Sequence, residues 1–263
     1  EMASRIKGID VLLTGHQHRV LTGEIQDCLV IQPGNNGQFY GEVDLELTSD
    51  SNEWKLTNQE AKVKSLEGFE ADPQLMAMTE PFEQSTQLWL DQPIGQVQGD
   101  MTITDSFQAR IQKHPFIEFI QQVQLDVSGV DISVTSLLSN ESQGFSSTIT
   151  MRDIVSNYIF PNTLEVLELS GHDIKEALEK TAAYFIVNSE RYLAVNPEYE
   201  YPKPQHFNYD MWEGIEYTIR VSNPIGRRVE NVTYQGTPLD LEKNYHVVMN
   251  NYRASGGGDF HMF

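Results

Sequence analysis

The sequence predicts a mixed α/β fold in three parts: an incomplete sheet, a helix, and a larger unit in which helices and strands alternate. Three observations support this prediction. A short apolar run at residues 9–14 ends at Gly15, and strand-like segments follow it. Apolar residues then recur at helical spacing between residues 72 and 93. Beyond Pro93, helical and strand patterns alternate to the end of the chain.

The first part of the chain has the pattern of strands. The continuous apolar run at residues 9–14 is typical of a buried strand that leads into a loop. Further strands are expected at residues 28–32, 39–47 and 54–63. Because about sixty residues with one buried strand cannot close a hydrophobic core, we expect the edge of a sheet without its centre.

A helix is expected to join two domains. Asp72 and Pro73 form a helix-start signal. The apolar residues that follow at near-helical spacing, up to Pro93, are Leu75, Met78, Phe82, Leu88 and Trp89. The domain limits that we predict are 1–68 for the incomplete sheet, 69–93 for the linking helix and 94–263 for the larger unit.

The larger unit shows both periodicities. Helices are expected at residues 116–127, opened by Pro115, at 151–158 and at 170–187. Strands are expected at residues 94–97, 130–138, 164–169, 215–221, 229–234 and 245–249. Polar, proline-rich or glycine-rich loops are expected at residues 140–148, 196–210 and 256–258.

Composition excludes several classes of function. The formal net charge of −20 argues against binding a nucleic acid polymer, which needs clustered Lys and Arg side chains. If the substrate is a phosphate ester, bound divalent metal ions would best offset this charge locally. The single cysteine, Cys28, excludes an internal disulfide framework. No apolar run approaches the ~20 residues of a transmembrane helix.

The most specific local pattern is His16-Gln17-His18, directly after the first strand and Gly15. Residues two apart on an extended segment point to the same side, so both imidazoles can face one cavity. Neutral imidazole is the commonest ligand of transition metals. Two histidines exposed on a loop are the alternative, and two imidazoles alone do not complete a metal site.

Five segments together resemble a known family. GIDVLLTGHQH, which contains this pattern, resembles the last metal-binding motif of calcineurin-like metallophosphoesterases. The downstream segments resemble the 5′-nucleotidase C-terminal domain, in its 2′,3′-cyclic-nucleotide 2′-phosphodiesterase/3′-nucleotidase branch. They are QPGNNGQFYGEVDLEL, IFPNTLEVLELSGHDIKEALE, NYDMWEGIEYTI and NNYRASGGGDF.

The resemblance implies an enzyme with two divalent metal ions, zinc, manganese or similar, in which His16 and His18 are metal ligands. The family's earlier metal motifs do not occur in this sequence, so we expect the chain alone to be inactive and the longer protein to be a hydrolase. The implied fold is the edge of the αββα sandwich of a metallophosphoesterase, joined by a helix to a mixed α/β nucleotide-binding domain. The implied location is extracellular, cell-wall-associated or periplasmic.

The resemblance also implies a substrate site. Tyr209 and Tyr252 match positions at which the family stacks a nucleobase between two rings; core packing is the alternative interpretation. Gly257 would let the backbone approach a ribose, and Asp259 would accept hydrogen bonds from the ribose hydroxyls, although the family often places this acid one position earlier.

Two polar positions have weaker signals. Asn140 falls where 5′-nucleotidases carry Asn-Gly-Gly-Gly-Ile-Arg, and the absence of that arginine favours a cyclic or 3′ substrate. Arg110 resembles a basic position near the phosphate, with a surface ion pair as the alternative.

Three rival functions remain open at this point. The intact protein could instead be a 5′-nucleotidase or UDP-sugar hydrolase, and the chain could be a non-catalytic module that binds a nucleoside or nucleotide. Composition alone would be satisfied by a purely structural role. The sequence does not indicate an oligomeric state.

Overall fold

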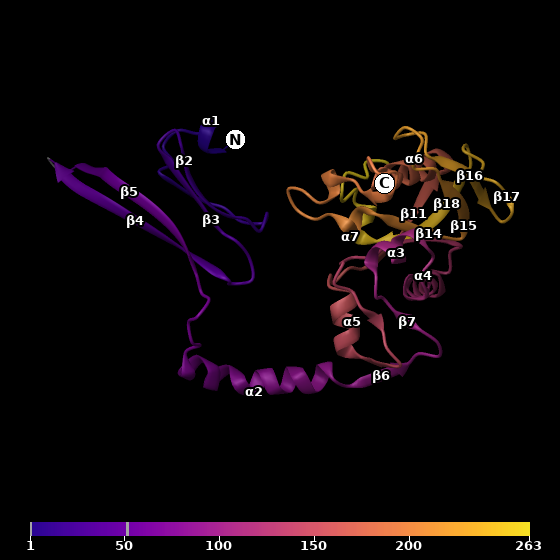
Figure 1. The fold of residues 1–263 in the computed structure, drawn as a ribbon, viewed down its shortest axis with the longest axis horizontal. Coiled ribbons are helices and arrows are strands. Elements are labelled where there is room, and N and C mark those ends of the chain that lie inside the picture. The colour runs from indigo at the N-terminus through magenta and orange to yellow at the C-terminus, as the bar shows by residue number, and fades with distance from the viewer. Residues whose placement is uncertain (1, 51–52) are drawn as a thin grey trace. The chain divides into compact units, whose positions relative to one another are not determined.

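The computed structural model describes residues 2–50 and 53–263 and confirms a mixed α/β fold (Figure 1). The chain divides into two compact units, residues 1–80 and residues 81–263. Each unit is considered by itself below. No helix in the described part of the chain is long and apolar enough to cross a membrane.

The first unit contains a three-stranded sheet and a long hairpin. Its elements are α1 (Met2–Arg5), β1 (Val11–Leu13), β2 (Val20–Ile25), β3 (Cys28–Pro33), β4 (Phe39–Asp50) and β5 (Glu53–Ser65). The sheet has the order β1-β3-β2, with β1 parallel and β2 antiparallel to β3, and β4 pairs with β5.

The buried strand of this unit is β3 and not β1. Cys28, Leu29 and Ile31 are at most 8% exposed, whereas Leu13 on β1 is 73% exposed. The interpretation of residues 9–14 as a buried strand is therefore wrong, because β1 is an edge strand and only β3 has neighbours on both sides.

The predicted linking helix is α2 (Pro73–Leu90). The Asp72 carboxylate caps it by accepting hydrogen bonds from the backbone N–H groups of Gln74 and Leu75, at 2.8 and 3.1 Å. None of its residues is buried, and the boundary between the two units lies within this helix, after Glu80. The limits of the three predicted domains stay predictions.

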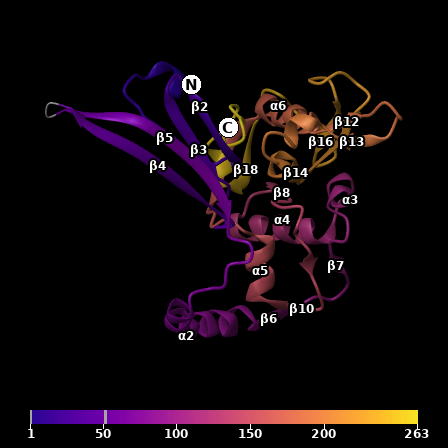
Figure 2. The same cartoon turned by 60° about the vertical axis from the view of Figure 1, so that its left-hand side comes forward.

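The second unit is built on a four-stranded sheet with the order β11-β18-β8-β14. Its strands are β8 (Ile132–Ser136), β11 (Leu164–Ser170), β14 (Asp210–Glu213) and β18 (Asn244–Asn250). Helix α6 (Gly171–Ala182) covers one face and α4 (Pro115–Ser128) the other, as both views show (Figures 1 and 2). β18 and β8 are parallel, and the other two pairings are antiparallel.

The remaining elements surround this sheet. They are β6 (Pro93–Gln96), β7 (Met101–Thr102), α3 (Ser106–Ile111), β9 (Gly144–Phe145), β10 (Thr148–Thr150), α5 (Met151–Asn157), β12 (Phe185–Val187), β13 (Leu193–Val195), β15 (Ile215–Ile219), β16 (Val229–Tyr234), β17 (Thr237–Pro238) and α7 (Asn251–Ala254), with 3₁₀ turns at Pro197–Tyr199 and His206–Asn208. Most predicted elements of this unit are confirmed to within a few residues.

The helix predicted at residues 170–187 begins as expected and ends early. Ser170 and Asp173 form a capping box at its start. The helix ends at Ala182, and the buried guanidinium of Arg228 donates to the carbonyls of Ala182 and Phe185, at 2.8 and 2.6 Å. Residues 185–187 then pair with β13 as a hairpin.

Candidate functional site

A buried ion pair joins β14 to the C-terminal loop. The Arg253 and Asp210 side chains are each 3% exposed, and a guanidinium Nη atom donates to Asp210 Oδ1 at 3.0 Å. Nε lies 2.9 Å from Oδ2 without the near-linear geometry of a hydrogen bond. Burial raises the pKa of Asp210 to about 6, and the neighbouring guanidinium of Arg253 opposes this shift.

The same guanidinium fixes two loops. It donates to the carbonyl oxygen of Phe207 at 3.0 Å, to the side-chain oxygen of Asn208 at 3.3 Å and to the carbonyl oxygen of Gly257. It also lies 3.9 Å from the centre of the Phe260 ring, within the range of a cation–π contact. Arg253 therefore connects the turn before β14 with the glycine-rich loop after α7.

The turn before β14 and helix α7 carry a pair of aromatic rings. Phe207 is half-buried and Tyr252 is 45% exposed, and their ring centres lie 6.1 Å apart at an angle of 75°. Gly257 lies against Tyr252: a Cβ atom at Gly257 would come within 2.6 Å of the tyrosine ring. The absence of a side chain at Gly257 thus determines where the ring of Tyr252 can lie.

Tyr209 lies elsewhere. It is 6% exposed, and its ring centre is 5.1 Å from that of Tyr184 and 5.0 Å from that of Phe185. In the described part of the chain, the ring facing Tyr252 belongs to Phe207. The geometry gives no support to pairing Tyr209 with Tyr252, because Tyr209 packs in a buried aromatic cluster.

The other predicted substrate residues are not all brought together. Asp259 is exposed in the loop that contains Gly257 and has a φ of 63°, seven positions after Tyr252 in sequence. Asn140 is exposed in the loop that follows β8. No contact in the described residues connects Asn140 to Phe207 or Tyr252.

Arg110 does not form a surface ion pair. It is 3% exposed on α3, and its Nη atoms donate to the carbonyls of Ser106 and Leu137 at 2.9 and 3.0 Å. Burial lowers the pKa of its guanidinium. Its Cζ atom lies 5.9 Å from the centre of the Tyr184 ring.

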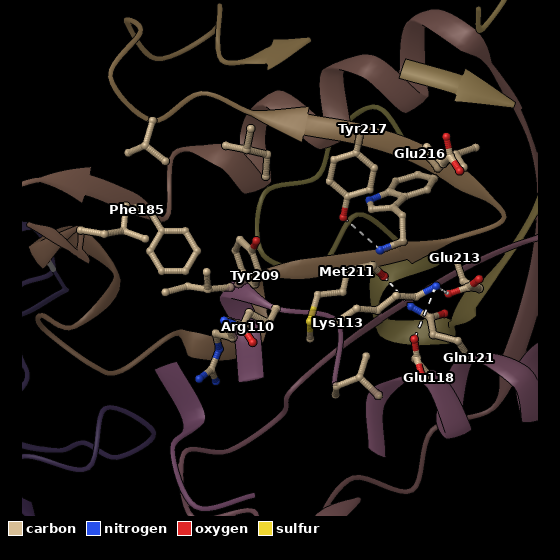
Figure 3. Close-up of a pocket in the computed structure, with 18 residues that line it drawn as sticks. Arg110, Lys113, Glu118, Gln121, Phe185, Tyr209, Met211, Glu213, Glu216 and Tyr217 are labelled. Carbon is tan, nitrogen blue, oxygen red and sulfur yellow. Dashed lines mark hydrogen bonds and ion pairs between the residues drawn. The ribbon is translucent and has the colours of Figure 1, made fainter. Parts of the chain in front are cut away.

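A cavity of about 530 Å³ lies between α3, α4, β14 and β15 (Figure 3). Its lining includes Arg110, Gln121, Phe185, Tyr209 and Tyr217. Neither Phe207 nor Tyr252 contributes to it. Tyr209 thus belongs to a cavity that is separate from the exposed ring pair.

His16 and His18 follow β1 in the first unit, and both are exposed. Their φ angles are 71° and 57°, so the segment is not extended and the argument that residues two apart point to one side does not apply. Within residues 2–50 and 53–263, no group of three or more His, Cys, Asp and Glu side chains could hold a metal ion. The residues present therefore do not form a metal site by themselves.

Sequence reasoning missed Phe207, Asp210 and Arg253. All three lie in or beside quoted motifs, FNYD and NNYRASGGGD. An arginine and an aspartate within two such motifs were the available signal for the ion pair, since charged residues are seldom buried unless paired.

Comparison with known proteins gives a consistent result. The family model of the 5′-nucleotidase C-terminal domain matches residues 93–263. The 2′,3′-cyclic-nucleotide 2′-phosphodiesterase/3′-nucleotidase of Yersinia enterocolitica is 27% identical, over 98% of this chain and 48% of its own length. The trifunctional nucleotide phosphoesterase protein YfkN of Bacillus subtilis is 23% identical, over 99% of this chain and 21% of its own length. The chain thus spans half or less of these relatives.

A solved structure is also similar. A Staphylococcus aureus protein assigned to the 5′-nucleotidases, crystallised with alpha-ketoglutarate, is 39% identical with a TM-score of 0.82, over 97% of this chain and 49% of its own. A cell wall protein of Listeria monocytogenes is 22% identical over 97% of this chain and 32% of its own length.

The raised pKa of Asp210 predicts a pH dependence of stability. Because the folded protein binds this proton more tightly than the unfolded chain does, Asp210 favours folding fully only below pH 3.8, and the contribution is lost as the pH rises through about 6. Asp210→Asn removes this pH-dependent contribution. Between pH 3.8 and about pH 6, the slope of the unfolding free energy against pH should therefore become more positive, by up to about 1.4 kcal/mol per pH unit.

Urea unfolding between pH 4 and pH 7 measures this slope. In a Trp54→Phe, Trp89→Phe background, the remaining Trp212 reports on the second unit. If the unfolding free energy varies with pH in parallel with and without Asp210→Asn, the pKa of Asp210 is not raised in the folded protein.

Proposed function

Because the chain belongs to the family of proteins that carry the 5′-nucleotidase C-terminal domain, we propose that it is the nucleotide-binding portion of a nucleotide phosphoesterase. The observation that carries this proposal is the ring pair Phe207 and Tyr252, with centres 6.1 Å apart on a 3₁₀ turn and on α7, which Arg253 connects. Relatives named as nucleotide phosphoesterases support the hydrolase class.

The ring pair suits a nucleobase. Tyr252 is 45% exposed, so a flat base can reach its face, and aromatic stacking stabilises a bound base by roughly 1–3 kcal/mol per contact. The rings now meet edge to face at 75°, so a base would have to turn one of them to lie between both. In this proposal the carboxylate of Asp259, exposed on the loop after α7, accepts hydrogen bonds from the ribose hydroxyls.

Hydrolysis is proposed for the longer protein and not for this chain. Two divalent metal ions would activate water and offset charge on the phosphate, as such ions do in dinuclear sites. His16 and His18 could supply only part of the ligands, and the described residues complete no such site. We propose that further residues of the longer protein provide the remaining ligands. We also propose that the longer protein acts outside the cytoplasm, which agrees with the name of the Listeria relative, a cell wall protein.

We propose a 2′,3′-cyclic or 3′ nucleotide as the substrate. This choice rests on the phosphoesterase named for these substrates and on the absence of Asn-Gly-Gly-Gly-Ile-Arg at Asn140. The 39% identity with a protein assigned to the 5′-nucleotidases favours 5′-nucleotide hydrolysis as the second candidate. Retention of His16 and His18 argues against a module that merely binds nucleosides.

Removal of either ring should weaken nucleoside binding. Phe207→Ala and Tyr252→Ala should each lower the affinity for 3′-AMP by about 5-fold to 100-fold, because each change removes one stacking surface. Calorimetric titration of the chain measures the change. Tyr192→Ala, at a tyrosine that is 68% exposed and outside this site, is the matched control. Unchanged affinity in both variants would show that the ring pair is misassigned.

A methyl group at Gly257 should displace the ring of Tyr252. Gly257→Ala places Cβ 2.6 Å from that ring and 2.5 Å from the carbonyl oxygen of Tyr252, so both the ring and the loop must shift. We therefore expect the affinity for 3′-AMP to fall by about 5-fold or more. Gly95→Ala is the control, because its Cβ would meet Ile149 at an ordinary 3.6 Å. Equal affinities for the two glycine variants in the same titration would argue against contact between Tyr252 and the base.

The chain by itself should not hydrolyse nucleotides. We expect no phosphate release from 2′,3′-cyclic AMP, 3′-AMP or 5′-AMP, with or without added Mn²⁺ or Zn²⁺, because the described residues complete no metal site. The longer protein should hydrolyse the cyclic and 3′ substrates faster than 5′-AMP. Faster release from 5′-AMP would select the second candidate function.

A further inference from the structure

The cavity between α3, α4, β14 and β15 contains buried polar atoms without partners. The side-chain oxygen of Gln121 and the indole nitrogen of Trp212 form no hydrogen bond in the structure, and these residues are 2% and 5% exposed. The Tyr209 hydroxyl is not one of these fully buried atoms, but it forms no hydrogen bond within the described chain. Buried polar groups in native proteins are normally satisfied, so a ligand or ordered water is expected here.

Two tyrosines with hydroxyl groups line this space. They are Tyr209, beside β14, and Tyr217 on β15, whose hydroxyl oxygen points between the lining residues in Figure 3. The Tyr217 hydroxyl accepts the backbone N–H of Trp212 at 3.3 Å, so its own proton stays available to a ligand. The cavity thus offers two hydroxyl donors and, at Gln121, one carbonyl acceptor.

The walls between these groups are largely apolar. Phe185, Met211 and Ile215 line the cavity together with Tyr209, and Phe185 and Tyr209 meet edge to face with ring centres 5.0 Å apart. The volume of about 530 Å³ lies within the range of about 300–1,000 Å³ common for small-molecule sites. Aromatic walls with a few directed polar groups suit a flat ring that has both donors and acceptors.

The charges around the cavity disfavour an anion. Lys113 already pairs with Glu213 at 2.7 Å and Glu118 at 3.6 Å. The Nη atoms of Arg110 are bound to backbone carbonyls, and its guanidinium points away from Tyr217 in Figure 3. Glu216 adds a third carboxylate to the lining. The lining holds three carboxylates and two cations; Lys113 is already paired, and within the described residues Arg110 keeps only its Nε without a partner. A phosphate group would therefore meet excess negative charge.

We propose that this cavity is a second ligand site, distinct from the Phe207–Tyr252 pair, which takes an uncharged nucleobase or nucleoside. The site selects against the corresponding nucleotides, because the lining supplies donors, an acceptor and aromatic surface, and its three carboxylates outnumber its two cations. This inference does not depend on the proposed function, since none of its contacts involves Phe207 or Tyr252.

Fluorescence of Trp212 tests the proposal in the whole chain. Trp54→Phe and Trp89→Phe leave Trp212, which lines the cavity, as the single tryptophan. Adding Tyr252→Ala removes one ring of the exposed pair, so a response reports the cavity. We expect adenine and adenosine to change the Trp212 emission, and 3′-AMP to need at least about a 10-fold higher concentration for the same change.

Tyr209→Phe is the decisive variant. It keeps the ring and removes only a hydroxyl that bonds to nothing in the described chain, so we expect no loss of stability and about a 3-fold to 10-fold loss of adenosine affinity. Tyr192→Phe, at an exposed tyrosine, is the matched control.

Three results would overturn the proposal. The first is that the emission of Trp212 does not change with millimolar adenine or adenosine. The second is that the change is lost with Tyr252→Ala, and the third is that Tyr209→Phe leaves the affinity for adenosine unchanged. Each leaves the proposed function standing, because that is tested by calorimetry at Phe207 and Tyr252. Failure of those titrations, with the Trp212 response intact, would reject the ring pair and keep the cavity.

Discussion

The arrangement of the second unit depends on a buried charge pair. Arg253 and Asp210 come from segments more than forty positions apart in sequence, and their contact carries the chain's C-terminal loop onto β14. A buried pair stabilises little net, whereas removing one partner typically costs about 3–5 kcal/mol, because the other charge is left without compensation. The pair is thus better understood as fixing which loops meet, since the same guanidinium also holds the carbonyls of Phe207 and Gly257.

β14 places two different environments beside one another. Phe207 precedes the strand and faces Tyr252, while Tyr209, two positions later, enters the buried cluster with Tyr184 and Phe185. The 3₁₀ turn at His206–Asn208 separates them, so neighbouring aromatic residues in FNY serve different surroundings. Residues two apart on an extended strand would share a face, so the divergence of Phe207 and Tyr209 comes from this turn and not from β14.

Much of the fold could be predicted from the sequence, and less of the site. Strands β11 and β18 and helices α4 and α6 have strong periodicity, and local pattern was sufficient for them. β14 is short and follows a proline-rich loop, so it has no comparable signal. Periodicity does not report the contacts and conformations that determine three features of the site. They are which of Phe207 and Tyr209 faces Tyr252, the hydrogen bond of buried Arg110 to the Leu137 carbonyl, and the left-handed backbone at His16.

Helix α2 differs from the other long helices because none of its residues is buried. Its amides are protected only by local hydrogen bonds and the Asp72 cap, and tertiary packing normally provides most helical stability in water. Amide hydrogens of α2 should therefore exchange with solvent far sooner than those of β8, all of whose residues are buried. Fraying at this point can occur without unfolding the sheet of either unit, which gives the polypeptide separate cooperative folding segments on its two sides.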